Sequence, residues 1–194
     1  MITDDQTNKV YFSKYLRDYK CWKSIKEALL EHEINFEMLP STKDIWVRDF
    51  MPIQKDVKSF IGYEYNPDYL KEEQQYTTHD VQNCFEFTHN NLMIMDVIVD
   101  GGNVIKCNDK VIMTDKVFVE NKEKNREFLK TVLEESFGCE VVFIPWDKAE
   151  KYGHSDGMVR YVEPEHIVIN NYADIDEQLR EELLKVLRLH FSKI

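Results

Sequence analysis

The chain has 194 residues, 43% of them hydrophobic and 31% charged, which is typical of a globular protein with a core of its own. Its formal net charge of -11 argues against a nucleic-acid partner, because phosphate contacts require clustered Lys and Arg, and favours a small cationic ligand. The chain has no apolar run of about 18 residues and no signal-peptide pattern at its start. We therefore expect no membrane association and a cytoplasmic location.

The four cysteines are widely separated in the sequence. They are Cys21, Cys84, Cys107 and Cys139, so neither a CxxC redox motif nor a zinc knuckle is present. This spacing predicts free thiols in a reducing compartment and gives no reason to expect a cofactor.

The first half of the chain contains one helical and two extended patterns. Apolar residues recur every three or four positions over 12–29 and predict an amphipathic helix. Ile34, Phe36 and Met38 alternate with polar residues and predict a strand over 34–39, and 54–62 is expected to form another. A loop rich in tyrosine follows over 63–80, and its tyrosines either line a pocket or pack the loop down.

The second half is more regular. A mostly buried strand is predicted over 93–99, two short strands over 104–106 and 111–114, a buried strand over 141–144, and a strand pair over 158–162 and 166–170. Asn121 is the expected N-cap of a helix with Phe128, Leu129 and Leu133 on its apolar face, ended by Gly138. Asp174 and Glu177 predict the start of a last helix that reaches about Phe191. The recurring strand–strand–helix–strand order predicts an α/β fold built from repeated modules.

Three charged segments follow predicted strands or lie in the loops that these strands feed. The first runs from Asp44 to Asp49 and contains Trp46 and Arg48, the second is Asp100-Gly-Gly-Asn103, and the third contains His154 and Asp156 between two glycines. Each has a structural interpretation when taken alone: a Trp that anchors a loop, a Gly-Gly turn with positive φ, and a solvated turn.

Taken together, the segments predict a single site. The carboxylates of Asp49, Asp100 and Asp156 repel one another unless a cation binds among them. That cation is either a metal held by His154, Asp156 and Asp100 or an organic cation. A guanidinium suits carboxylates best, because its planar fork of donors matches their oxygens, and His154 is then the proton carrier.

These three segments, in this order, resemble those of the agmatine deiminase and bacterial Porphyromonas-type peptidyl-arginine deiminase family of guanidino-group-modifying enzymes. The resemblance covers about 34–170. It implies a partial α/β propeller (pentein) of about three ββαβ modules, with residues 1–194 as a single domain that lacks the C-terminal modules.

The resemblance also implies an activity, the hydrolysis of a guanidino group to a ureido product and ammonia, without metal or cofactor. His154, Asp100 and Asp156 would be catalytic, and Asp49, Trp46, Arg48 and Asn103 would bind the substrate. Asp100 stands where many family members have Glu. Agmatine, peptidyl-arginine and free arginine share the guanidinium, so the substrate within this class stays open.

The chain departs from the family pattern in one respect. The family's nucleophilic cysteine lies near the C-terminus in a Gly-rich segment, whereas here no cysteine follows Cys139. We therefore expect no cysteine sulfur beside His154, and a non-catalytic guanidino-binding module is the alternative function. The missing modules would leave open apolar flanks, including the face of the last helix, which predicts association with a second copy or with a separate C-terminal partner.

Overall fold

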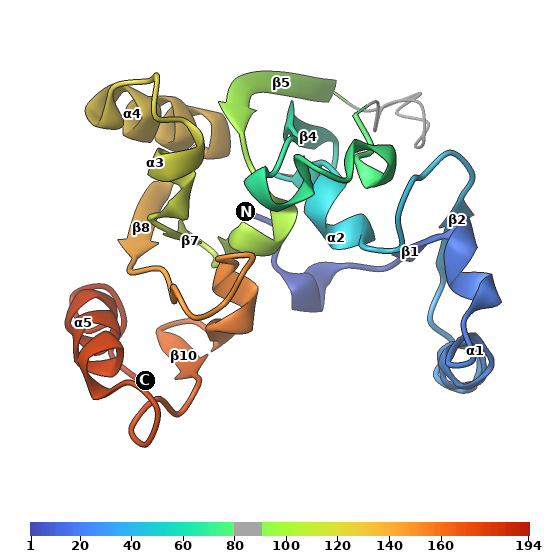
Figure 1. Ribbon diagram of the computed structural model, residues 1–194. Coiled ribbons are helices and arrows are strands. Elements are labelled where there is room, and N and C mark those ends of the chain that lie inside the picture. Colours follow the sequence, from blue (N-terminus) through green and yellow to red (C-terminus); the bar gives the residue numbers. More distant parts are fainter. Residues whose placement is uncertain (80–90) are drawn as a thin grey trace.

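The computed structural model describes residues 1–79 and 91–194. Within these residues the strands form four small sheets, two with two strands and two with three. The sheets and their helices follow one another as four units along an open arc, with the first unit and the last at its two ends (Figure 1).

The first unit is a pair of parallel strands joined by a helix. β1 (Val10–Ser13) pairs with β2 (Phe36–Leu39), and η2 (Lys14–Asp18) and α1 (Trp22–Glu31) connect them. The prediction for 34–39 is confirmed, but the helix predicted over 12–29 begins only at Trp22. The apolar spacing has another origin: Phe12 on β1 packs edge-on against Trp22 and Phe36, with ring centroids 5.7 and 6.3 Å away. The helical spacing of these apolar residues thus came from an aromatic cluster between β1, α1 and β2 and not from one face of a single helix.

The second unit is a three-stranded sheet. β3 (Ile53–Gln54) pairs antiparallel with β4 (Ser59–Glu64), which pairs parallel with β5 (Asn91–Ile98). The strand predicted over 54–62 is therefore a hairpin, closed by Asp56, whose carboxylate accepts hydrogen bonds from two following backbone amides. β5 was predicted to be mostly buried, which is wrong for its first half, where Met93 and Ile94 are exposed.

The tyrosine-rich loop lies between β4 and β5. Its described part contains two short 3-10 turns, η3 (Asp68–Leu70) and η4 (Gln74–Tyr76), and Asp80, the last residue of the predicted loop, lies outside the described residues. Tyr65 is buried against Phe50, as expected for a tyrosine that packs a loop down.

The third unit has the complete ββαβ order. β6 (Ile105–Lys106) pairs antiparallel with β7 (Lys110–Thr114), which pairs parallel with β8 (Glu140–Ile144), as predicted. Two helices, α3 (Lys116–Glu120) and α4 (Arg126–Phe137), connect β7 to β8.

The cap of α4 differs from the prediction. Asn125, not Asn121, accepts hydrogen bonds from the first amides of the helix, while the carboxamide of Asn121 bonds the N–H and C=O of Ile98 on β5. Leu129 and Leu133 are buried as predicted, Phe128 is exposed, and Gly138 ends the helix with a φ of 70°.

The fourth unit consists of β9 (Val159–Glu163), antiparallel β10 (His166–Ile169) and α5 (Glu177–Leu187). The N-cap of α5 is Asp176, which accepts from the Leu179 amide at 2.9 Å, and not Asp174. The helix ends four residues before Phe191. Its apolar face is already buried on the third and fourth units, so α5 does not provide the open flank that we expected.

Neighbouring units share their cores. One buried cluster joins the second and third units, and another joins the third and fourth. A smaller cluster containing Leu39, Phe50 and Tyr65 connects the first two. Each unit therefore covers the flank of the next, and the predicted partial α/β propeller is confirmed. That 1–194 forms one cooperative domain stays a prediction.

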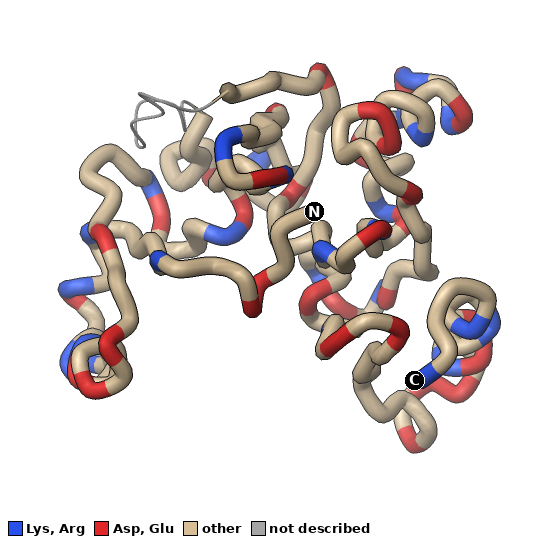
Figure 2. The backbone as a smooth tube through the Cα atoms, turned by 180° about the vertical axis from the view of Figure 1, so that it is seen from behind, with Lys and Arg blue, Asp and Glu red and all other residues tan. Residues whose placement is uncertain are grey.

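Charge is distributed over the whole arc. The helices at its two ends, α1 and α5, carry residues of both signs (Figure 2), so the acidic excess is not confined to one unit. Of the helices in the described residues, none combines the length and apolarity needed to cross a bilayer.

Candidate active site

The three charged segments form three short helical turns that pack in series. α2 (Val47–Phe50) contacts η6 (Gly101–Asn103), and η6 contacts η7 (Ser155–Gly157). Asp49 lies within α2, whereas Asp100 and His154 are the extended residues that precede η6 and η7. The packing of the turns brings the three charged side chains to one place.

The two glycines of η6 allow this packing. A Cβ on Gly102 would lie 2.8 Å from Asp49 Oδ1 and closer still to His154 Nδ1, and one on Gly101 would overlap the Arg48 carbonyl. The positive-φ glycines in the described residues are Gly138 and Gly153. The interpretation of Gly101-Gly102 as a turn with positive φ is therefore wrong. Glycine is required at both positions because their backbone lies close to two other turns and leaves no room for a side chain.

His154 is held between two carboxylates. Its Nε2 lies 3.0 Å from Asp100 Oδ2, and its Nδ1 lies 3.8 Å from Asp49 Oδ1. The side chains of His154 and Asp49 are 14% exposed and that of Asp100 is 2% exposed. Burial alone would lower the pKa of His154, but the hydrogen bond to Asp100 and the charges of Asp49, Asp100 and Asp156 outweigh it and raise the pKa.

The carboxylates affect one another as the sequence suggested. Burial, reinforced by Asp100 and Asp156, raises the pKa of Asp49 to about 7, against the opposing charges of His154 and Arg48. Asp156 lies at the exposed rim, where partial burial of its carboxyl raises its pKa although the charge of His154 opposes this. Asp49, Asp100 and His154 thus lie together, and Asp156 is near enough for its charge to raise the pKa of His154.

The other predicted site residues lie around this cluster. Trp46 precedes α2 and is 63% exposed. Arg48 donates from Nε to the Gly101 carbonyl at 3.0 Å and from Nη2 to the Val104 carbonyl at 2.7 Å. Asn103 is buried and accepts from the Thr114 amide at 2.8 Å. The side chains of Arg48 and Asn103 therefore bind backbone groups of neighbouring segments, and their role in substrate binding stays a prediction.

Two aromatic rings beside His154 were not assigned to the site from the sequence. The ring centroids of Tyr69 and Tyr152 lie 6.1 and 5.9 Å from that of the imidazole, and the two tyrosines meet edge-on at 4.9 Å. Tyr69 belongs to the loop whose tyrosines allowed two interpretations, and here it lines the site. The position of Tyr152, two residues before His154, was the available signal.

A buried lysine supports these rings. Lys116, 1% exposed, donates to the Tyr152 carbonyl at 2.7 Å and pairs with Asp68 and Glu120 at 2.9 and 3.2 Å. Burial, with the charge of Asp100, raises the pKa of Glu120 to about 7 despite Lys116. The sequence held no signal for this cluster, because a lysine at the start of a helix is usually solvated.

The described cysteines lie elsewhere. Cys107 is buried in the core of the third and fourth units, Cys139 packs against that of the second and third, and Cys21 is exposed; all three are free thiols. Cys84 lies outside the described residues. Over 1–79 and 91–194, no three His, Cys, Asp or Glu side chains are placed to hold a metal ion.

Solved structures of two agmatine deiminases and of a DDAH have the same fold as this chain. The chain is similar to C. jejuni agmatine deiminase (TM-score 0.65, 17% identity, covering 96% of this chain and 69% of the other). It is also similar to Enterococcus faecalis agmatine deiminase (TM-score 0.66, 16% identity, covering 94% of this chain and 62% of the other). A DDAH from Pseudomonas aeruginosa, complexed with citrulline, aligns less closely (TM-score 0.55, 12% identity, covering 96% of this chain and 91% of the other).

The sequence comparison is more specific than the fold. No curated protein matches the chain. However, the sequence matches the Porphyromonas-type peptidyl-arginine deiminases over residues 4–190, nearly its whole length. The chain therefore belongs to the Porphyromonas-type peptidyl-arginine deiminase family.

Proposed function

We propose that this cluster binds the guanidinium group of a small cationic substrate and that the chain is a deiminase-type hydrolase. The supporting observation is the largely buried imidazole of His154, 3.0 Å from Asp100 and 3.8 Å from Asp49. Three carboxylates around one histidine leave net negative charge in a largely buried place, which a guanidinium neutralises with paired hydrogen bonds.

Each residue has a proposed role. Asp49 and Asp156 bind the guanidinium nitrogens, Asp100 orients His154, and exposed Trp46 covers the bound group. Arg48 and Asn103 hold the Asp100 segment through their backbone contacts. A carboxyl with a pKa of about 7, as for Asp49, is readily deprotonated when a cation arrives.

The proposed reaction forms and breaks bonds at the guanidinium carbon. A thiolate adds to this carbon, the C–N bond to one terminal nitrogen breaks, and His154 protonates that nitrogen, which leaves as ammonia. Water then adds to the same carbon and displaces the thiolate, which gives the ureido product. Among the described cysteines, Cys21, Cys107 and Cys139 lie away from His154, so none of these three is assigned this role.

The second candidate is a guanidino-binding module without hydrolysis. One observation favours it: in the described part of the chain, the hydrogen-bond, ion-pair and ring partners of His154 are two aspartates and two tyrosines. A binding module needs the carboxylates but no nucleophile.

Calorimetry with agmatine and arginine amide tests the proposed site. We expect binding by the purified chain, and its loss in Asp49→Asn. The matched control is Asp109→Asn, a carboxylate that is 75% exposed and remote from the cluster. A colorimetric ureido assay on the same samples separates the two functions. Failure of both ligands to bind would overturn the proposal.

Association with a second copy or a separate C-terminal partner, and a cytoplasmic location, remain proposals. The motivation for association is now the incomplete arc alone, because α5 is covered within the chain. Light scattering at micromolar concentration should give a mass above that of the 23.2 kDa chain. A stable monomer would rule out self-association.

A further inference from the structure

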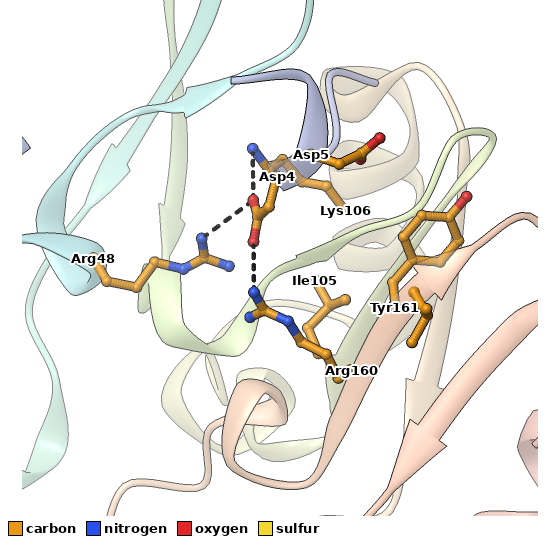
Figure 3. Close-up of a pocket in the computed structure, with 8 residues that line it drawn as sticks. Asp4, Asp5, Arg48, Ile105, Lys106, Arg160 and Tyr161 are labelled. Carbon is orange, nitrogen blue, oxygen red and sulfur yellow. Dashed lines mark ion pairs between the residues drawn. The ribbon is translucent and has the colours of Figure 1, made fainter. Parts of the chain in front are cut away.

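A second charged cluster includes Arg48 and is built around Asp4. The carboxylate of Asp4, in the turn η1 (Asp4–Gln6), is surrounded by three cations (Figure 3). Its Oδ1 lies 3.3 Å from Lys106 Nζ and 3.8 Å from Arg48 Nη1, and its Oδ2 lies 3.8 Å from Arg160 Nη2. We call Arg48, Lys106 and Arg160 the cation cradle.

The fold fixes one cation of this cradle independently of Asp4 and buries a second. The three cations lie on α2, β6 and β9, so they come from three consecutive units. Arg48 is fixed by its bonds to the Gly101 and Val104 carbonyls, and the side chain of Lys106 is only 10% exposed. Arg160 is exposed; among the described residues its ion-pair partner is Asp4, and its charge also acts on Asp156. Arg48 is therefore held independently of Asp4, and the exposed Arg160 can close on a ligand.

A carboxylate fills the cradle poorly. Charge-assisted N···O hydrogen bonds are about 2.7–2.9 Å long, whereas the contacts to Asp4 are 3.3–3.8 Å. A cavity of about 300 Å³ adjoins the cluster. Asp5 does not fill it, because its carboxylate turns away from the two arginines and accepts the Thr3 hydroxyl (Figure 3). A larger anion, with oxygens in three directions, would reach all three cations at hydrogen-bond distance.

We propose that the cation cradle is a binding site for a tetrahedral phosphate-class dianion, either free phosphate or a phosphate monoester, and that Asp4 occupies it when no ligand is bound. Asp5 also lines the cavity, but the three cations form their ion pairs with the single carboxylate of Asp4, and a dianion supplies one more negative charge than Asp4 does. The cavity leaves room for the ester group of a monoester. The cradle shares Arg48 with the guanidino site, but the anion proposal does not depend on the proposed function.

Asp4 is a charged competitor at neutral pH. Partial burial would raise the pKa of its carboxyl, but Arg48, Lys106 and Arg160 together outweigh burial and lower it. A ligand must therefore displace an anion. Asp4→Asn keeps the shape of the side chain and removes that charge, so it should open the site.

The experiment measures binding of inorganic phosphate to the full-length chain by calorimetry at constant ionic strength. We expect at least about tenfold tighter binding in Asp4→Asn than in the parent, and loss of that gain in Asp4→Asn/Arg160→Gln. The matched control is Asp4→Asn/Arg180→Gln, which removes an arginine that pairs with Glu177 on α5. Phenyl phosphate and acetate, tested on the same proteins, separate a monoester ligand, free phosphate and a simple carboxylate.

Each outcome decides. Selective tightening for phosphate or phenyl phosphate that needs Arg160 supports the site, and the tighter of the two identifies the ligand class. Equal binding of phosphate by the parent and Asp4→Asn would overturn it, as would equal losses in the Arg160 and Arg180 variants. If acetate binds as tightly as phosphate, the cation cradle accepts any carboxylate, and the proposed preference for a dianion is refuted.

Discussion

Replacement of Asp100 by Asn tests whether the carboxylate cluster controls the proton on His154. Asn keeps the size of the side chain, and its amide oxygen can still accept from Nε2, but the charge is removed. The second carboxylate oxygen, Asp100 Oδ1, is buried without a hydrogen-bond partner in the described structure. The amide nitrogen can take its place without breaking an existing bond, so the change isolates the charge.

The size of the effect follows from the 3.0 Å contact. A hydrogen bond to a charged group contributes about 1.5–3 kcal/mol, and about 1.4 kcal/mol corresponds to one pKa unit. Loss of this charge should therefore cost the charged imidazole about 1.5–3 kcal/mol and lower the pKa of His154 in Asp100→Asn, since burial, which opposes the charged imidazole, remains.

Stability should change with a defined sign. The folded pKa of His154 is raised above its ordinary value of 6.5, so its contribution is fully present below about pH 6.5 and is lost as pH rises through the folded pKa. Asp100→Asn should therefore destabilise the chain most in mild acid. The difference should shrink or reverse at alkaline pH, where the parent buries an aspartate beside a neutral imidazole.

The assay is an NMR titration of the imidazole Cε1–H signals, with His154 assigned as the signal missing from His154→Gln. The chain has six histidines, and the other five serve as internal controls. Asp109→Asn should leave the His154 titration unchanged. If His154 titrates at the same pH in Asp100→Asn as in the parent, Asp100 does not stabilise its charged form, and the proposed acid–base pair is wrong.

Three further predictions concern the site and the core. Because the pKa of Asp49 is about 7 and guanidinium binding needs its carboxylate, agmatine affinity should rise with pH by up to about tenfold per unit below pH 7 and level off above it; a flat profile in calorimetry would contradict this. Gly102→Ala should abolish agmatine binding in a folded chain, because its Cβ would meet the imidazole and Asp49, whereas Gly157→Ala, with nothing within 4 Å of its Cβ, should bind normally. Leu183→Ala, in the core of the third and fourth units, should lower the free energy of unfolding in urea by about 2–5 kcal/mol. Ile175→Ala, at an 81% exposed side chain, should change it by less than about 0.5 kcal/mol. Equal losses of stability in the two variants would contradict the burial of Leu183.

The sequence by itself determined the elements and motifs that depend on local order. The hairpin of β6 and β7, the buried strand β8, the pair β9–β10 and the Gly138 cap were predictable because turn residues and apolar alternation act over a few positions. The three charged segments were recognisable for the same reason, since each lies within one short turn.

The tertiary structure decided what depends on contacts between distant segments. Asn121 looked like a cap, but its carboxamide is bound by β5, so Asn125 caps α4 instead. Glycine is required at position 102 because the neighbouring turns leave no room for a Cβ atom. Lys116 can be buried because Asp68 and the Tyr152 carbonyl bind its ammonium group. The cation cradle joins residues of three units to Asp4. A pKa, a close approach and an ion cluster are set by distances and burial, and those exist only once the chain has folded.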